Sequence, residues 1–247
     1  MWKLSLFFVL GAQLVSPSIL AGSETNVSVK PQPHPIEHVV LLALDGLSVK
    51  GIQEAHTPNL DKLAESGVYL SRSRGVMPTK SAPNWASILS GVYPNDHGIH
   101  SNQWWWFRFK RRLSYPTLFT AVKEADPQAQ TAVLYEWNHF GKLFHPQDLD
   151  YRRWVPEYAA TTTEAANLFG GGTPRFTVIH LVSADMAGHE HTWGSPAYIQ
   201  GIEFVDSQVG TIVKQLKANG TLNKTLLVLA SDHGGVDHGH GGSSDTE

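Results

Sequence analysis

The sequence predicts an α/β domain in which a mostly parallel, doubly wound sheet carries helices on both faces. Short apolar runs at residues 38–44, 176–182 and 225–230 have the length and composition of buried strands. Helical patterns separate these runs, the longest over residues 195–218, and strands that alternate with helices are typical of a parallel sheet. Each run also leads into an aspartate, and in such sheets ligand sites gather at the carboxyl ends of the strands.

The remaining elements follow from cap and turn residues. Thr57 and Pro58 predict the N-cap and first residue of a helix that stops at Gly67. We then expect a short strand over residues 68–71, a loop over 78–84 leading into a helix that ends near 90, a helix over 116–125 and a strand over 131–135. The long helix over 195–218 presents one apolar face, formed by Ile202, Val205, Val209, Ile212, Val213 and Leu216.

The N-terminal 21 residues have the features of a secretory signal peptide. Lys3 supplies a positive start, residues 4–10 form an apolar core, and small residues follow up to Ala21. The core is short for a membrane span, so we expect a secreted or periplasmic protein with no stable span after cleavage. The alternatives are a buried first helix and an uncleaved anchor.

The rest of the chain divides into a linker and one domain. Residues 22–37 are polar and rich in proline, which predicts a linker, and residues 38–247 are expected to form the catalytic domain. The chain stops just after a glycine-rich loop at residues 239–242. Because such a loop rarely ends a domain, we expect the domain to be truncated at its C-terminus.

Composition limits the chemistry of any site. A formal net charge of -3 gives no general attraction to nucleic-acid polymers or anionic membranes. The absence of cysteine excludes disulfides and thiolate metal sites. A metal site must therefore use histidine and carboxylate ligands, which suit zinc and other borderline divalent ions.

Candidate metal ligands follow the strands. Asp185 and His189 are four residues apart, so they can reach one ion from a tight loop or from one helical turn. Asp232 and His233 are adjacent, and on an extended backbone their side chains should point apart and serve a metal pair, one directly and the other from the opposite side or as a bridge. The ordinary alternative for each pair is a surface aspartate hydrogen-bonded to a histidine.

The glycine-rich tail offers two more histidines, His238 and His240, on either side of Gly239. One of them could complete the ligand set of a second ion, and His240 is favoured because its flanking glycines let the backbone bend around a ligand. The alternative is a flexible tail that binds metal casually.

Ser81 is the candidate nucleophile. It precedes a predicted helix, where free N–H groups and the helix dipole attract anions. Lys80 adjoins it, and Asn84 lies one turn later as a possible oxyanion donor. A serine at this place is ordinarily only an N-cap, but a nearby metal would make its oxygen a nucleophile.

Five segments carry a family resemblance. They read LALDG (42–46), HTPNLDKLAESGV (56–68), MPTKSAPNWASILSGVYPNDHGIHSN (77–102), DMAGHEHTWGSP (185–196) and SDHGGVDHGHGG (231–242). Together they resemble the alkaline phosphatase superfamily, and most closely its type I phosphodiesterase/nucleotide pyrophosphatase branch. The resemblance extends from about residue 38 to the end of the chain and implies an alkaline-phosphatase-like core.

The resemblance implies roles for particular residues. Asp45, Asp232 and His233 match the ligands of the zinc ion that binds the nucleophile Ser81, where many relatives have threonine. The ligands of the second zinc ion are matched by Asp185, His189 and His240. The asparagine that binds a phosphoryl oxygen is matched by Asn84. Trp85 departs from the pattern, because a histidine often follows that asparagine.

The implied activity is hydrolysis of phosphodiester or pyrophosphate bonds in small, nucleotide-type phosphoesters, with two Zn²⁺ ions and a covalent phosphoserine-type intermediate. The alternatives are a phosphomonoesterase on the same scaffold and an inactive or incomplete fragment that only binds ligands. The aromatic stretch at residues 104–109 could clamp a nucleobase, although covering the edge of the core is the more usual role.

Overall fold

The computed structural model describes residues 35–103 and 115–242, together with the backbone of residues 7–10. The linker, most of the predicted signal peptide and the aromatic stretch at 104–109 lie outside the described residues. Predictions about these segments therefore stay predictions.

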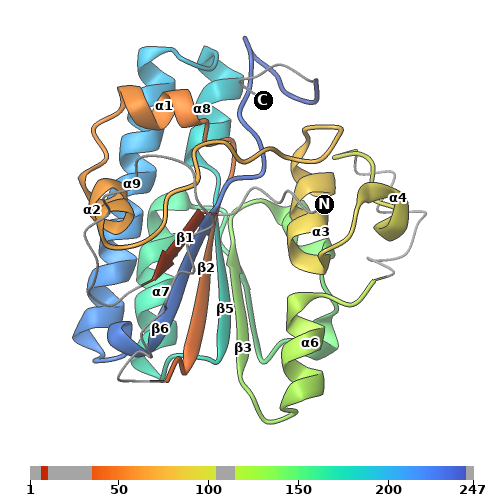
Figure 1. Cartoon of the computed structure of the whole chain (residues 1–247), viewed down its shortest axis with the longest axis vertical. Coiled ribbons are helices and arrows are strands. Elements are labelled where there is room, and N and C mark those ends of the chain that lie inside the picture. The colour runs from red at the N-terminus through yellow and green to blue at the C-terminus, as the bar shows by residue number, and fades with distance from the viewer. Residues whose placement is uncertain (1–6, 11–34, 104–114, 243–247) are drawn as a thin grey trace, which may run out of the picture.

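The core of the molecule is one sheet with the strand order β1-β6-β2-β5-β3-β4 (Figure 1). Five strands run parallel: β6 (Thr225–Ala230), β2 (His38–Leu44), β5 (Phe176–Leu181), β3 (Thr131–Tyr135) and β4 (Tyr151–Trp154). The edge strand β1 (Phe7–Leu10) pairs antiparallel with β6. The mostly parallel sheet expected from the sequence is confirmed.

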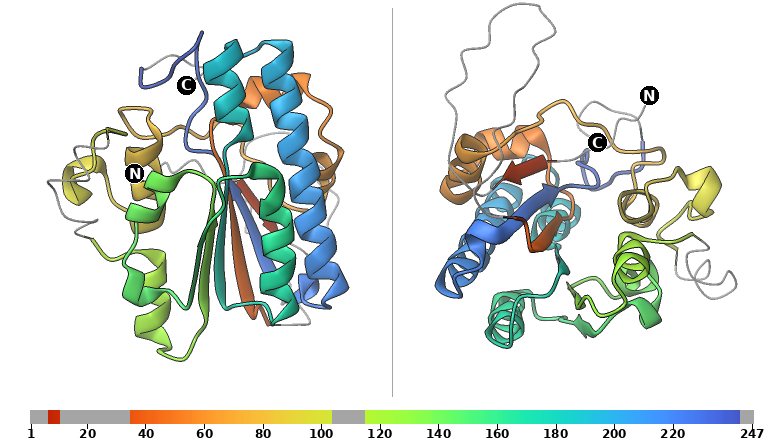
Figure 2. Two further views of the ribbon diagram at one scale, coloured as in Figure 1. Left: turned by 180° about the vertical axis from the view of Figure 1, so that it is seen from behind. Right: turned by 60° about the horizontal axis from the view of Figure 1, so that its bottom comes forward.

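Helices cover both faces of the sheet, as the turned views in Figure 2 show. One face packs against α1 (Val49–Glu54), α2 (Pro58–Ser66), α7 (Thr161–Gly170) and α9 (Pro196–Ala218). The other face packs against α3 (Ser81–Ser90) and α6 (Leu118–Ala125). Alternate residues of each strand enter the two cores, so Phe176 and Val178 of β5 lie in the core under α3 and α6 while Ile179 lies in the core under α9.

Shorter elements complete the described fold. They are α4 (Pro94–His97), α8 (Ser183–His191) and the 3₁₀ helices η1 (Asn138–Lys142), η2 (Pro146–Asp148), η3 (Tyr158–Ala160) and η4 (Leu222–Lys224). No helix of the described part of the chain is both long and apolar enough to cross a membrane.

Most predicted elements agree with the structure, but the strand expected over residues 68–71 is wrong. After α2, Val68 forms only a single β-bridge and residues 69–71 form no strand; Val68, Tyr69 and Leu70 are 47%, 41% and 41% exposed. Residues 68–71 are therefore not one of the strands of the sheet.

The start of α2 also differs from the prediction. Thr57 occupies the N-cap position, but its side chain makes no capping hydrogen bond. Instead, the carboxylate of Asp206 on α9 accepts hydrogen bonds from the backbone N–H groups of Leu60 (2.8 Å) and Asn59 (3.1 Å). A buried carboxylate from a neighbouring helix therefore satisfies the free N–H groups and ties α2 to α9.

Candidate metal centre

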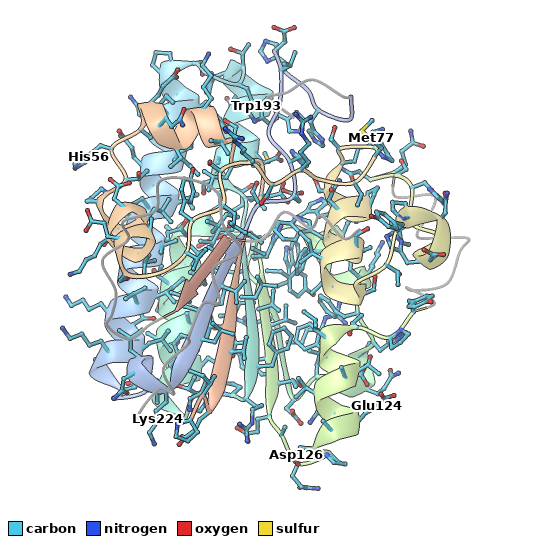
Figure 3. The ribbon with its side chains drawn as sticks, in the orientation of Figure 1. His56, Met77, Glu124, Asp126, Trp193 and Lys224 are labelled. Atoms are coloured by element: carbon cyan, nitrogen blue, oxygen red, sulfur yellow. The ribbon has the colours of Figure 1, made fainter. Side chains whose placement is uncertain are left out.

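Polar side chains from three segments meet at the carboxyl end of the sheet. Asp45 directly follows β2, Asp232 and His233 come just after β6, and Asp185 lies in the first turn of α8, which follows β5. Trp193 and Met77 mark this end in Figure 3, whereas Lys224 and Asp126 mark the opposite end. The parallel strands thus bring together residues that are up to 188 positions apart.

The first group of potential ligands, the inner cluster, consists of Asp45, Asp232 and His233. Their ligand atoms lie within 4.8 Å of one another, and all three residues are buried. The Nε2 atom of His233 is 3.3 Å from Asp232 Oδ2 and 3.5 Å from Asp45 Oδ1. The expectation that Asp232 and His233 point apart is wrong, because the chain leaves β6 and bends at Asp232.

The second group, the outer cluster, consists of Asp185, His189 and His240. Asp185 and His189 stand one turn apart on α8, with 3.6 Å between Oδ1 and Nε2, and His240 Nε2 is 4.0 Å from the same oxygen. The His189 side chain is 41% exposed, so this cluster is open to solvent. Of the two arrangements expected for Asp185 and His189, the structure has the helical turn.

The two clusters form one site. Asp185 Oδ1 lies 4.0 Å from His233 Nε2, and the rings of His233 and His240 stack with their centroids 3.7 Å apart. Two cations held here would be close neighbours, which is the arrangement that in-line phosphoryl transfer uses.

All three histidines of the clusters present a lone pair to the site. The Nδ1 atoms of His233, His189 and His240 lie 2.7, 2.9 and 2.8 Å from the backbone oxygens of Gly234, His238 and Thr79. A carbonyl only accepts, so each Nδ1 carries the hydrogen and each neutral ring leaves Nε2 as a free acceptor. Histidines that bind metals are commonly oriented in this way.

His238 supports the outer cluster from outside it. Its backbone oxygen accepts from His189, and its own Nδ1–H donates to the backbone oxygen of His189 at 2.9 Å. Of the two tail histidines, the structure therefore brings His240 to the site and uses His238 to hold His189.

Three carboxylate oxygens in the site have no hydrogen-bond partner although they are buried. They are Asp45 Oδ1, Asp185 Oδ1 and Asp232 Oδ2. Buried charged oxygens are costly unless a donor or a cation meets them. The oxygens and the imidazole Nε2 atoms are hard and borderline ligands, so the donor set fits divalent ions such as zinc.

Electrostatics across the two clusters favours a cation as well. Burial and the negative charge of Asp45 raise the pKa values of Asp232 and Asp185 well above their usual range. Burial also acts to raise the pKa of Asp45, but hydrogen bonds and positive charge, chiefly from His180, outweigh it and lower that pKa to about 2. Burial lowers the pKa of His233 to about 4, which keeps its ring neutral and able to bind a metal.

Ser81 is the first residue of α3 and lies against the inner cluster. Its Oγ atom is 3.1 Å from His233 Nε2, and because that nitrogen carries no hydrogen, the hydroxyl donates to it. Lys80 occupies the N-cap position, and a Cβ added at Gly241 would lie only 2.8 Å from its Cε. The glycine-rich tail therefore passes directly over the Lys80 side chain.

The structure argues against Asn84 as an oxyanion donor. Its Nδ2 group donates to the backbone oxygens of Lys80 (2.9 Å), Pro78 (3.1 Å) and Val76 (3.2 Å), and its Oδ1 accepts from the Val76 N–H at 2.7 Å. The amide is fully used in holding the loop that carries Ser81.

Asn102, which sequence reasoning did not single out, lies at Ser81 instead. Its Nδ2 group is 3.3 Å from Ser81 Oγ, and its Oδ1 accepts from the Ala82 N–H at 2.8 Å. The only signal for it was its position at the end of the motif at residues 77–102, because spacing alone does not show which asparagine faces the serine.

Comparisons with known proteins identify the family of this chain. Residues 39–240 match the family model described as type I phosphodiesterase / nucleotide pyrophosphatase. Ectonucleotide pyrophosphatase/phosphodiesterase family member 3 of Bos taurus is 26% identical over 83% of this chain and 25% of its own, and member 1 of Rattus norvegicus is 31% identical over 79% and 24%. The chain thus spans about a quarter of the length of these relatives.

Solved structures share the fold. Murine ectonucleotide pyrophosphatase / phosphodiesterase 5, solved in complex with AMP, superposes with a TM-score of 0.69 at 18% identity, over 80% of this chain and 57% of that one. A 2-O GAG sulfatase superposes with a TM-score of 0.63 at 16% identity, over 85% and 61%. The alkaline-phosphatase-like core expected from the sequence is confirmed.

Proposed function

The chain belongs to the type I phosphodiesterase / nucleotide pyrophosphatase family, and we propose that it is a two-zinc hydrolase of phosphodiester or pyrophosphate bonds in nucleotide-type substrates. One observation carries the proposal. Three buried carboxylate oxygens without hydrogen-bond partners and the hydroxyl of Ser81 all lie around the Nε2 atom of His233. A serine beside a cation site has the placement that nucleophilic catalysis needs.

The two clusters would hold one zinc ion each. Asp45, Asp232, His233 and Ser81 would bind the first, and Asp185, His189 and His240 the second. When bound, the ions supply charge that lowers the pKa of the serine hydroxyl and polarises the phosphoryl oxygens.

The proposal consists of two displacements at phosphorus, the first by Ser81 and the second by water. The Oγ atom of Ser81 forms a bond to phosphorus as the bond from phosphorus to the leaving oxygen breaks; the hydroxyl proton goes to the departing oxygen, and a covalent phosphoserine-type ester results. A water oxygen then displaces Oγ, and a proton of that water returns to Oγ and regenerates the serine. Asn102 donates a hydrogen bond beside Ser81, and the N-terminus of α3 and Lys80 add positive potential for the phosphoryl oxygens.

Substrate class and location rest on supporting observations. AMP is bound in the murine neighbour, which favours a small nucleotide-type phosphoester as partner. Relatives named as ectonucleotide enzymes, and the signal-like sequence before Ala21, favour an exported protein, secreted or periplasmic.

A paired assay tests the proposal. Zinc-loaded protein is given a chromogenic nucleotide diester and the matching phosphate monoester, with Ser81→Ala as the control that keeps the other ligands. We expect the diester to be cleaved and the variant to be inactive. Preference for the monoester would make the chain a phosphomonoesterase, and a zinc-loaded chain that cleaves neither substrate would reduce it to a binding protein.

A further inference from the structure

The two carboxylate oxygens of Asp45 have different surroundings. Oδ2 accepts two hydrogen bonds, from Trp85 Nε1–H and from His180 Nε2–H, each 2.9 Å long. Oδ1 has no partner and points toward the inner cluster, 3.5 Å from His233 Nε2. One oxygen is held by the protein and the other is left to a cation.

His180 occupies a position in β5 where the burial of the strand would normally favour an apolar residue. It belongs to the β5 face formed by Phe176 and Val178, which packs against α3, and it is fully buried. Its Nδ1 atom has no partner, so burying this ring costs free energy that an apolar side chain would not. The bond from its Nε2 to Asp45 is the only hydrogen bond that the described residues give this ring.

The two donors are held in place by aromatic packing. The His180 ring stacks on Phe140, with centroids 4.1 Å apart and planes 21° apart, and meets Trp85 edge to face at 5.5 Å. Trp85 in turn meets Phe140 edge to face at 5.7 Å. The three rings pack against one another, and this packing fixes the direction of both N–H groups toward Asp45.

We infer that His180 and Trp85 are positioning residues that hold Asp45 so that it offers a single oxygen, Oδ1, to the ion beside Ser81. This inference rests on the proposed function. A carboxylate with one oxygen already bonded to two N–H groups binds a cation through the other oxygen only, and its orientation does not have to be fixed on binding.

The inference accounts for the departure at Trp85. Trp85 follows Asn84, and its side chain lies at Asp45. Its indole N–H donates to Asp45 Oδ2 at the position where the resemblance suggests a histidine. A histidine does reach Asp45, but from the neighbouring strand: His180 of β5 pairs with Ala43, two residues before Asp45. The two donors reach the carboxylate from α3 and from β5.

Zinc affinity of the two sites, measured by competition with a chelator, tests the inference. His180→Leu removes the donor and also the unpartnered Nδ1, so the fold should keep its stability while the inner ion binds about 10- to 100-fold more weakly. His180→Gln, whose amide can place an N–H near the Nε2 position, should bind within a few-fold of the wild type. Affinity of the outer ion should not change.

A matched control and a second variant keep the outcome decisive. Thr177→Val removes another buried, partnerless polar atom of β5 that has no bond to Asp45, and it should bind both ions as the wild type does. Trp85→Phe keeps a ring but removes the other donor, and it should weaken the same ion if His180→Leu fails to fold. Wild-type zinc affinity in His180→Leu or, where that variant does not fold, in Trp85→Phe would overturn the inference.

Asp45→Asn separates the inference from the proposed function. If it loses the inner ion while His180→Leu and Trp85→Phe do not, the metal site stands and the positioning role is wrong. If Asp45→Asn also binds both ions normally, the metal site itself is wrong and the inference fails with it.

Discussion

The inner and outer clusters contain the same kinds of ligand in different surroundings. In the inner cluster Asp45, Asp232 and His233 are all buried and follow two adjacent central strands. In the outer cluster, His189 is exposed on α8 and His240 comes from the tail, so only Asp185 is close to the sheet. The contrast teaches that one site is built into the core and the other is assembled on its surface.

The difference predicts unequal binding. The inner ligands are pre-positioned by hydrogen bonds, such as the one from Gly46 N–H to Asp232 Oδ1 at 3.2 Å, so little freedom is lost when an ion binds. The outer ligands depend on a tail whose register rests on the reciprocal His189–His238 bonds. We expect the outer ion to exchange first in a chelator and the inner ion to leave slowly.

Removing an inner ligand should have the largest effect. Asp232→Asn loses the charge of a buried ligand next to Ser81, so we expect the chain to lose one of its two ions and activity to fall by at least about 10⁴. His189→Ala should lose the outer ion, but excess zinc should restore part of its activity. Zinc content and kcat of both variants are the measurements, and equal losses in the two would break the comparison.

Ser81→Ala separates chemistry from metal binding. The variant removes the nucleophile but leaves three protein ligands in each cluster, so both ions should remain and kcat should fall by at least about 10³. Ser81→Thr should keep substantial activity, because threonine keeps a hydroxyl at this position. Chiral-phosphorus analysis of the wild type should show net retention, because each of two in-line displacements inverts. Net inversion would mean that water attacks directly.

The two asparagines near Ser81 should fail in different ways. Asn102→Ala removes a donor at the nucleophile, so kcat should fall about 10²- to 10³-fold with little change in Tm. Asn84→Ala removes four hydrogen bonds to the loop at residues 76–80, so Tm should fall and activity should follow the folded fraction. The opposite pattern would restore Asn84 as the oxyanion donor.

Glu136 should give the smallest effect, a pH dependence of stability. Burial raises its pKa from 4.5 to about 7, against hydrogen bonds from Thr161 Oγ1 and the Val182 N–H just before α8. The folded state then binds a proton at Glu136 more tightly than the unfolded state does. The contribution of this proton to the free energy of unfolding is therefore complete below about pH 4.5 and is lost as the pH rises to about 7.

Glu136→Gln is the variant that isolates this group. Its neutral amide keeps an oxygen acceptor and cannot titrate, so the decline in the free energy of unfolding between these pH values should be shallower in metal-free variant than in metal-free wild type. Parallel curves for the two proteins would assign the decline to the metal clusters instead.

Sequence reasoning identified the elements whose residues carry a strong pattern. The strands at 38–44 and 225–230 are continuous apolar runs and appear with those limits, and the helix at 195–218 has a clear apolar face. β4 was missed because it is a mostly exposed edge strand with two arginines, Arg152 and Arg153, and so lacks a buried pattern. α8 was left open because its polar residues serve the site rather than a core.

In the candidate site, the sequence predicted which residues meet but not how their side chains are oriented. The seven predicted ligands all lie in or against the two clusters, because parallel strands end at one edge. The bend at Asp232 and the choice between Asn84 and Asn102 depend on backbone direction after a strand or helix ends. His180 was missed for the opposite reason, since it lies within an apolar run and resembles a core residue.

The central claim is that two neighbouring clusters of unequal depth each hold a zinc ion. Zinc counting during dialysis against a chelator tests it most directly, with Asp232→Asn and His189→Ala beside the wild type. The wild type should begin with about two ions per chain and lose them in two separate phases, whereas each variant should begin with one, slow to leave in His189→Ala and fast in Asp232→Asn. A wild type that holds no zinc, or that loses both ions in one phase shared by the variants, would contradict the account.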